Sequence, residues 1–129
     1  MSNGRKSGRG NRYRSGYLLS VEWFMRRDLW FQVEQRHRGA LACAGCGRLA
    51  ARRDLELHHI DYRGVVQRGG RWLACESHDD LTALHPRCHE LLHRLIDRDR
   101  VLRYHRSRQA ATAIALRRLR ASIGGGSDA

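Results

Sequence analysis

The sequence predicts an α+β fold for one small domain, and three observations lead to this prediction. Apolar residues recur at helical spacing near both ends of the chain, over residues 20–38 and 109–122. Between these two helices, the run Leu55–His58 has the character of a short strand. Two short motifs with the spacing of metal ligands, at 43–46 and 85–88, flank that strand. A metal bound by both motifs would hold the strand against the helix that follows.

The first predicted helix runs from Ser20 to Arg38. Ser20 is a suitable N-cap, Glu22 favours the positive end of the helix dipole, and Gly39 is a suitable stop. Because its apolar residues recur at helical spacing, we expect them to face the core. These residues are Val21, Phe24, Met25, Leu29 and Val33.

The remaining elements follow in chain order. The segment 40–57 contains short apolar runs broken by glycines and suits a zinc knuckle that leads into the strand. Residues 63–79 hold three glycines and are expected to form a long surface loop. Pro86 can begin a helix, since the first helical position needs no backbone donor, and the last helix covers 109–122. The apolar face of the helix from Pro86 consists of Leu91, Leu92, Leu95 and Ile96.

Both ends of the chain differ in composition from the middle. Residues 1–16 hold five basic side chains and four glycines, and the chain ends in Gly-Gly-Gly-Ser-Asp-Ala. Such segments cannot bury enough apolar surface to offset the entropy of ordering. We therefore predict a disordered basic arm over 1–16, a single domain over 17–122 and a flexible tail over 123–129.

The charge of the chain favours a nucleic-acid partner. The net charge is +12, and Lys6 is the only lysine, so almost all the positive charge is guanidinium. Arginine binds phosphate through a planar fork and stacks on bases. The alternative is that the arginines reflect a GC-rich coding sequence and serve only a soluble surface. No stretch approaches the length of a membrane span, so we expect a cytoplasmic protein with no membrane partner.

Four cysteines in a cytoplasmic chain favour thiolate ligands over disulfides. Cys43 and Cys46 form a CxxC knuckle, and His85 and Cys88 repeat its spacing with one histidine. Two such pairs can close a tetrahedral structural zinc site. Cys75 and His78 have the same spacing and compete for the second pair, and unmetallated buried thiols are the simplest alternative.

A second set of histidines predicts a second metal. His58 and His59 are adjacent at the end of the predicted strand, and His89 and His93 lie four apart on one helix face. If the zinc knuckle holds this helix against the strand, three of these histidines can converge on a metal that keeps positions open for water and a phosphate oxygen. Consecutive strand residues point to opposite faces. His58 and His59 therefore share a site only where the strand end is irregular or the scissile phosphate lies between them.

The order of these motifs resembles the HNH endonucleases. The matching residues are Leu-His-His-Ile-Asp-Tyr at 57–62 and Asp-Leu-Thr-Ala-Leu-His-Pro-Arg-Cys-His at 80–89, followed by His93. The family pattern has a double histidine after a strand, an Asn-Leu or Asp-Leu step, and then CxxCH leading into a helix. The resemblance covers residues 43–93. It implies a small ββα-metal core, stapled by a structural zinc and flanked by N- and C-terminal helices.

The resemblance also implies roles for individual residues. His59 would be the general base, with His58, His89 and His93 as ligands of the catalytic metal. Asp80 stands where the family usually has asparagine, so it would bind the metal or support the loop. His85 stands where most members have cysteine and would still bind zinc, and this alignment favours His85 and Cys88 over the pair of Cys75 and His78.

We therefore expect a metal-dependent endonuclease that nicks or cleaves DNA, leaving 5′-phosphate and 3′-hydroxyl ends by resemblance. A neutral imidazole takes a proton from water, and a divalent metal, Mg²⁺, Mn²⁺, Ni²⁺ or Zn²⁺, stabilises the developing charge. The candidate DNA-contacting residues are Arg87, Arg94, Arg117, Arg118 and Arg120.

No separate recognition domain of usable size is visible, so we expect low intrinsic specificity unless a protein partner supplies it. The competing hypotheses are a non-catalytic zinc module that binds nucleic acid and an accessory factor of a phage or mobile-element machine. The binding module would use the same zinc ligands and positive charge but does not need the second set of histidines. The accessory factor would retain weak nicking activity.

Overall fold

The computed structural model describes residues 16–124 of the 129-residue chain. The predicted basic arm and tail lie outside these residues, apart from Gly16, Ile123 and Gly124. Helices and two small antiparallel sheets make up the fold, which confirms the α+β class. The helices are α2 (Val21–Arg38), α3 (Pro86–Arg98), α4 (Arg100–Tyr104) and α5 (Arg108–Gly124), with short 3-10 turns at Arg52–Asp54 and His78–Asp80. The strands are β1 (Glu56–His59), β2 (Val65–Arg68), β3 (Arg71–Ala74) and β4 (Leu81–Leu84).

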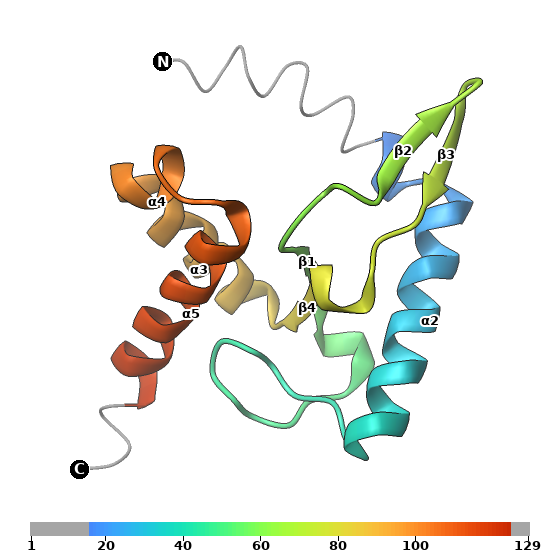
Figure 1. Ribbon diagram of the computed structural model, residues 1–129. Helices are drawn as coiled ribbons and strands as arrows, with labels where there is room; N and C mark the ends of the chain where they lie inside the picture. Colours follow the sequence, from blue (N-terminus) through green and yellow to red (C-terminus); the bar gives the residue numbers. More distant parts are fainter. Residues whose placement is uncertain (1–15, 125–129) are drawn as a thin grey trace.

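The sheet formed by β1 and β4 lies near the middle of the molecule, with helices on both sides of it (Figure 1). Helix α2 and the β2–β3 hairpin lie on one side of it, and α3, α4 and α5 lie on the other. The two strands run antiparallel, with Glu56 opposite Leu84 and His59 opposite Leu81. Because β4 leads directly into α3, Glu56 at the start of β1 lies at the end of the sheet where α3 begins, and α3 packs against β1.

Helix α2 begins and ends where its caps predict. The Ser20 hydroxyl accepts a hydrogen bond from the Trp23 amide at 3.1 Å. Gly39 ends the helix in the left-handed region, with φ of 78°, and its amide donates to the carbonyl of Gln35 at 2.8 Å. A residue with a Cβ is disfavoured at this φ, so glycine is the suitable stop.

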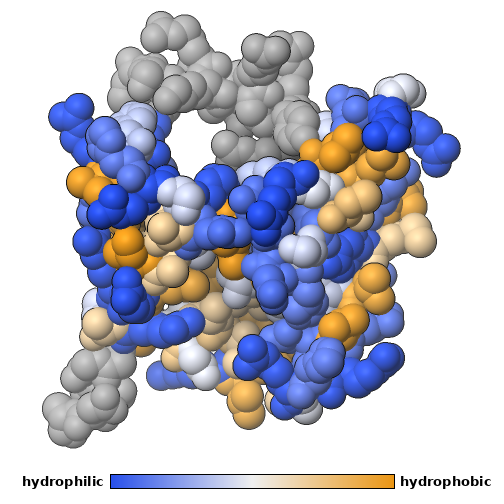
Figure 2. Space-filling view, viewed as in Figure 1, coloured by the Kyte–Doolittle hydropathy of each residue, from blue (hydrophilic) through white to orange (hydrophobic). Residues whose placement is uncertain are grey.

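The prediction for the buried face of α2 is wrong. Trp23, Trp30 and Phe31 are buried, whereas Val21 and Met25 each remain 67% exposed. Aromatic side chains bury the largest areas, and these three set the rotation of the helix. Of the other predicted core residues, Phe24 and Leu29 are exposed and Val33 is half-buried. In Figure 2, apolar patches lie among the hydrophilic atoms on the side of α2 and the β2–β3 hairpin.

Two substitutions in α2 test this rotation. We expect Trp30→Ala to lower the free energy of unfolding by about 3–5 kcal/mol, because it leaves a large cavity. Met25→Ala, on the exposed face, should change it by less than about 0.5 kcal/mol. Urea denaturation of the zinc-loaded proteins measures both. If Met25→Ala cost as much as Trp30→Ala, the helix would be rotated as the apolar spacing predicted.

The predicted surface loop over 63–79 contains a β-hairpin instead. Val65 pairs with Ala74 and Arg68 with Arg71, and the connecting Gly69 and Gly70 both have positive φ. A two-residue turn with positive φ at both positions matches the twist of antiparallel strands. Paired glycines between two short apolar runs are therefore a hairpin signal that the loop prediction overlooked. Helix α4 was also not predicted. Within residues 16–124, no helix is long and apolar enough to cross a membrane.

Candidate metal centres

Three cysteines and one histidine gather where the knuckle meets the start of α3. The Sγ atoms of Cys43, Cys46 and Cys88 and a ring nitrogen of His85 all lie within 4.8 Å of one another. The closest measured pair is Cys46 Sγ and His85 Nδ1, at 3.4 Å. A tight turn between the bridged residues Ala42 and Leu49 carries the first two cysteines. His85 is the N-cap residue of α3, just after β4, and Cys88 lies in the first turn of α3.

At Gly45 the backbone of the knuckle lies close to the side chains of Cys88 and Leu119. A Cβ on Gly45 would lie 2.9 Å from the Cβ of Cys88 and 3.0 Å from Leu119, so only glycine fits there. Burial raises the pKa of the Cys43 thiol, but hydrogen bonds from the amides of Cys46, His85 and Gly45 outweigh it and set the pKa at about 7. A thiol that ionises near neutral pH is a suitable metal ligand. This Cys3His group can therefore hold a structural zinc ion.

The competing pair lies elsewhere in the fold. Cys75 is exposed, and His78 stacks on Trp30 with 4.9 Å between ring centroids. The Nε2 atom of His78 also lies 2.8 Å from Glu34 Oε1. Neither residue belongs to a candidate metal group among residues 16–124. The ligand set at the knuckle is the one with His85 and Cys88.

Three histidines form a second group on the α3 side of the sheet. His58 Nδ1 lies 3.3 Å from His89 Nε2, and His93 Nε2 lies 3.1 Å from the same nitrogen. His58 comes from β1, whereas the other two lie four residues apart on α3 and share its inner face. The predicted convergence of these three rings is therefore present in the fold.

The geometry of the three rings fits a metal ion. Two imidazole nitrogens bound to one ion at about 2.1 Å lie about 3.0–3.4 Å apart, and the measured separations fall in that range. The outer nitrogens have polar partners, Thr112 Oγ1 at 3.2 Å from His58 and Glu56 Oε1 at 2.9 Å from His89. Such partners orient metal-binding histidines. Burial, with help from the neighbouring His93 and His89, lowers the pKa of His58 to about 2, so this ring stays neutral, as a ligand must.

A cavity of about 280 Å³ opens beside these histidines. His58 and His93 line it, together with Arg103 from α4, Arg106 from the connection after α4 and Arg108 from the start of α5. No motif in the sequence singles out these three arginines. They lie outside the motif region, and only the packing of α4 and α5 brings them to the cavity.

The predicted DNA-contacting arginines lie on other surfaces, and several bind the protein itself. Arg94 pairs with Glu90 at 2.6 Å, and Arg118 pairs with Asp99 at 2.6 Å. The Nε atom of Arg120 donates to the carbonyl of Ala44 at 2.7 Å and so fastens α5 to the knuckle. The other two, Arg87 and Arg117, are exposed.

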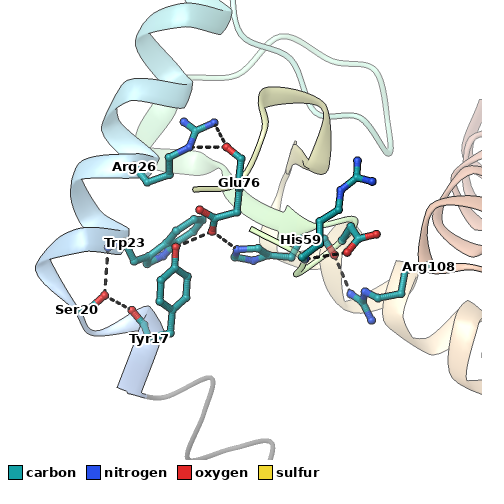
Figure 3. Close-up of polar contacts among 9 residues, drawn as sticks. Tyr17, Ser20, Trp23, Arg26, His59, Glu76 and Arg108 are labelled. Atoms are coloured by element: carbon teal, nitrogen blue, oxygen red, sulfur yellow. Dashed lines mark hydrogen bonds and ion pairs between the residues drawn. The ribbon is translucent and has the colours of Figure 1, made fainter. Parts of the chain in front are cut away.

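His59 lies on the opposite face of β1 from His58, as strand alternation requires. Its Nε2 atom is 2.7 Å from Glu76 Oε2, and its ring centroid lies 4.7 Å from that of Trp23 and 4.5 Å from that of Tyr62. Figure 3 shows this contact with Glu76 on the α2 side of the sheet. The structure therefore does not bring His59 into the group formed by the other three histidines.

Asp80 holds the loop that follows β1. Its two carboxylate oxygens accept hydrogen bonds from Arg63 at 2.8 and 2.9 Å, and its carbonyl accepts from the amide of Ile60 at 2.8 Å. The hydrogen bonds from Arg63 keep the pKa of the Asp80 carboxyl below its usual range. Asp80 belongs to neither candidate metal group in the described chain. Of its two predicted roles, the structure favours loop support.

Fold and site together define a small α+β protein with two separate groups of potential metal ligands. Comparisons with protein-family models, with curated proteins and with solved structures find no match for this chain. A function for this chain is therefore inferred from the chemistry of its own residues.

Proposed function

We propose that the protein is a metal-dependent endonuclease of the HNH type that hydrolyses phosphodiester bonds in DNA. The observation that carries the proposal is the group of His58, His89 and His93, which is separate from the cysteine-rich group and opens to a cavity lined by arginines. A module that only binds nucleic acid uses positive charge and a zinc staple but does not need a second set of ligands.

The order of elements supports the same proposal. Two antiparallel strands, β1 and β4, lead into α3, and the cysteine-rich group spans the junction between β4 and α3. This arrangement is compatible with the ββα-metal core that the motifs predict. In it, one strand and one helix supply the three histidines.

His58, His89 and His93 would hold the catalytic metal, which when bound supplies positive charge to the phosphate in the transition state. The three arginines of the cavity bind the phosphates on either side of the cleaved bond. Each guanidinium offers a planar fork to phosphate oxygens. The net charge of +12 adds long-range attraction for DNA.

His59 is the general base in this proposal. It follows His58 directly in β1, and its backbone carbonyl accepts a hydrogen bond from Arg108 at 2.8 Å, so it is tied to the wall of the cavity. The Tyr62 ring stacks on His59, and the Arg108 guanidinium lies 4.8 Å from the Tyr62 ring on its other side. Water reaches the His59 ring when DNA draws Arg108 toward a phosphate and Tyr62 turns aside.

Plasmid nicking tests the proposal. Supercoiled plasmid is incubated with wild-type protein and Mg²⁺ or Mn²⁺, with and without EDTA, and DNA binding is measured in parallel. We expect metal-dependent nicking that falls by about 10²–10⁴-fold in His59→Ala, because a general base contributes a factor of this size. His37→Ala, which changes an exposed histidine at the end of α2, is the matched control and should cut like wild type.

The binding assay separates this proposal from its main alternative. A protein that binds DNA tightly and cuts with none of the four candidate metals would be a nucleic-acid-binding zinc module. A protein that cuts equally well after His59→Ala would remain a nuclease but would use another base.

A further inference from the structure

Glu76 is a buried carboxylate on the α2 side of the sheet, and its Oε2 atom has two partners. The Tyr17 hydroxyl donates to it at 2.6 Å, and His59 Nε2 lies 2.7 Å away (Figure 3). The Glu76 side chain is 0% exposed and that of His59 is 3% exposed. The other oxygen, Oε1, is buried and has no hydrogen-bond partner among the described residues.

The backbone of Glu76 is held as firmly as its side chain. Both Nε and an Nη atom of Arg26 donate to the Glu76 carbonyl, at 3.0 and 2.8 Å. A Cβ on Gly64 would lie 2.5 Å from the Glu76 backbone, so the loop after β1 packs directly against it. The carboxylate therefore cannot move away from His59 without disturbing α2 and this loop.

A buried carboxylate is costly to a domain of this size. Burial raises the pKa of the Glu76 carboxyl, but the hydrogen bonds from His59 and Tyr17 outweigh it, and the pKa lies below its ordinary value. Glu76 therefore stays ionised and acts only as an acceptor. Burial and Glu76 raise the pKa of Tyr17 well above its ordinary value, so the phenol remains a donor.

An ionised carboxylate at Nε2 decides which nitrogen of His59 carries the proton. Because Glu76 can only accept, Nε2 must donate, and in the neutral ring Nδ1 is then the nitrogen with a free lone pair. The Trp23 ring, 4.7 Å from the imidazole between ring centroids, packs against His59 and helps to hold it toward Glu76. One tautomer and one ring orientation are selected together.

We propose that Glu76 is a positioning residue for the base, holding His59 in the tautomer whose Nδ1 accepts the proton of the attacking water, with Tyr17 as the second anchor of the carboxylate. This inference rests on the proposed nuclease function. It adds a residue from between β3 and β4 and one from before α2, neither of which belongs to the motif that predicted the site.

A buried hydrogen bond between His59 and Glu76 with a purely structural role would predict something different. It would affect the free energy of unfolding and leave kcat of the folded protein unchanged. A positioning residue affects kcat through His59 alone, so its effect disappears when His59 is absent.

The first experiment measures kcat and KM for cleavage in a double-mutant cycle. Glu76→Met removes the acceptor at similar size, and we expect kcat to fall at least about tenfold with KM changed by less than about twofold. Glu76→Gln keeps one acceptor oxygen and should recover part of the loss. In the His59→Ala background, Glu76→Met should cost less than about twofold more. An equal loss of kcat in both backgrounds would overturn the proposal.

The second measurement needs no substitution of Glu76 and no cleavage. Long-range ¹H–¹⁵N spectra of the zinc-loaded full chain near neutral pH report which ring nitrogen of His59 is protonated, with His59→Gln assigning the signals. We expect a protonated Nε2, and a protonated Nδ1 would overturn the proposal even if the Glu76 variants failed to fold. Absence of cleavage by wild type would overturn the proposed function and with it the catalytic role of Glu76, while the tautomer would still be read from the spectrum.

Discussion

Loss of zinc from the Cys43, Cys46, His85 and Cys88 group is expected to unfold the domain. A zinc ion bound by this group would join the knuckle to the junction of β4 with α3. Helix α3 carries two of the three histidines of the second group. A structural zinc ion contributes an apparent binding free energy of about 10–16 kcal/mol near neutral pH. A domain with roughly 100 folded residues has a stability of only about 5–15 kcal/mol. We therefore expect the fold to depend on the ion.

Far-UV circular dichroism and thermal melting of Cys46→Ala measure this effect. The variant should lose its cooperative transition and bind less zinc than wild type. Cys75→Ala is the matched control, because Cys75 is exposed and lies outside the group, and it should melt like wild type. If Cys46→Ala retained the wild-type melting temperature, the four side chains would be ordinary buried groups.

Local signals in the sequence predicted the positions of the long helices but missed the β2–β3 hairpin and α4. Ser20 and Gly39 delimit α2 because capping depends on a few neighbouring backbone groups. The rotation of α2 was not predictable in the same way. Two apolar stripes compete along it, and the one with Trp23 and Trp30 is buried because the rest of the fold offers space for large rings there.

The ligand groups were predictable from short spacings together with the resemblance, which favoured His85 and Cys88 over the equally spaced Cys75 and His78. A CxxC turn and an i, i+4 pair each aim two side chains at one point whatever the rest of the chain does. The partners of His59 had no such signal. Tyr17 and Glu76 lie 59 residues apart in sequence, and only tertiary packing brings them together. Likewise, composition predicted a basic surface but could not distinguish Arg118, which pairs with Asp99, from Arg106, which lines the cavity.

Substitution of His89 is expected to remove the second metal and with it cleavage, without unfolding the protein. His89 Nε2 lies within 3.3 Å of the ring nitrogens of both His58 and His93, so it is the central ligand of the group. Loss of one of three protein ligands leaves too few to hold a divalent ion that also carries water. We expect nicking to fall by at least about 10³-fold, since both charge stabilisation and substrate positioning go with the metal.

Metal stoichiometry separates this effect from a loss of zinc. Reconstituted with Co²⁺, the wild-type chain should bind two ions and His89→Ala only the thiolate-bound one, which its sulfur-to-metal absorption identifies. Glu56→Gln is a graded companion, because Glu56 Oε1 contacts His89 Nδ1 at 2.9 Å from outside the group. Its affinity for the second ion should fall by about 10–100-fold. A wild-type chain that binds only one ion at saturating Co²⁺ would mean that the three histidines are a polar cluster, and the nuclease proposal would lose its main support.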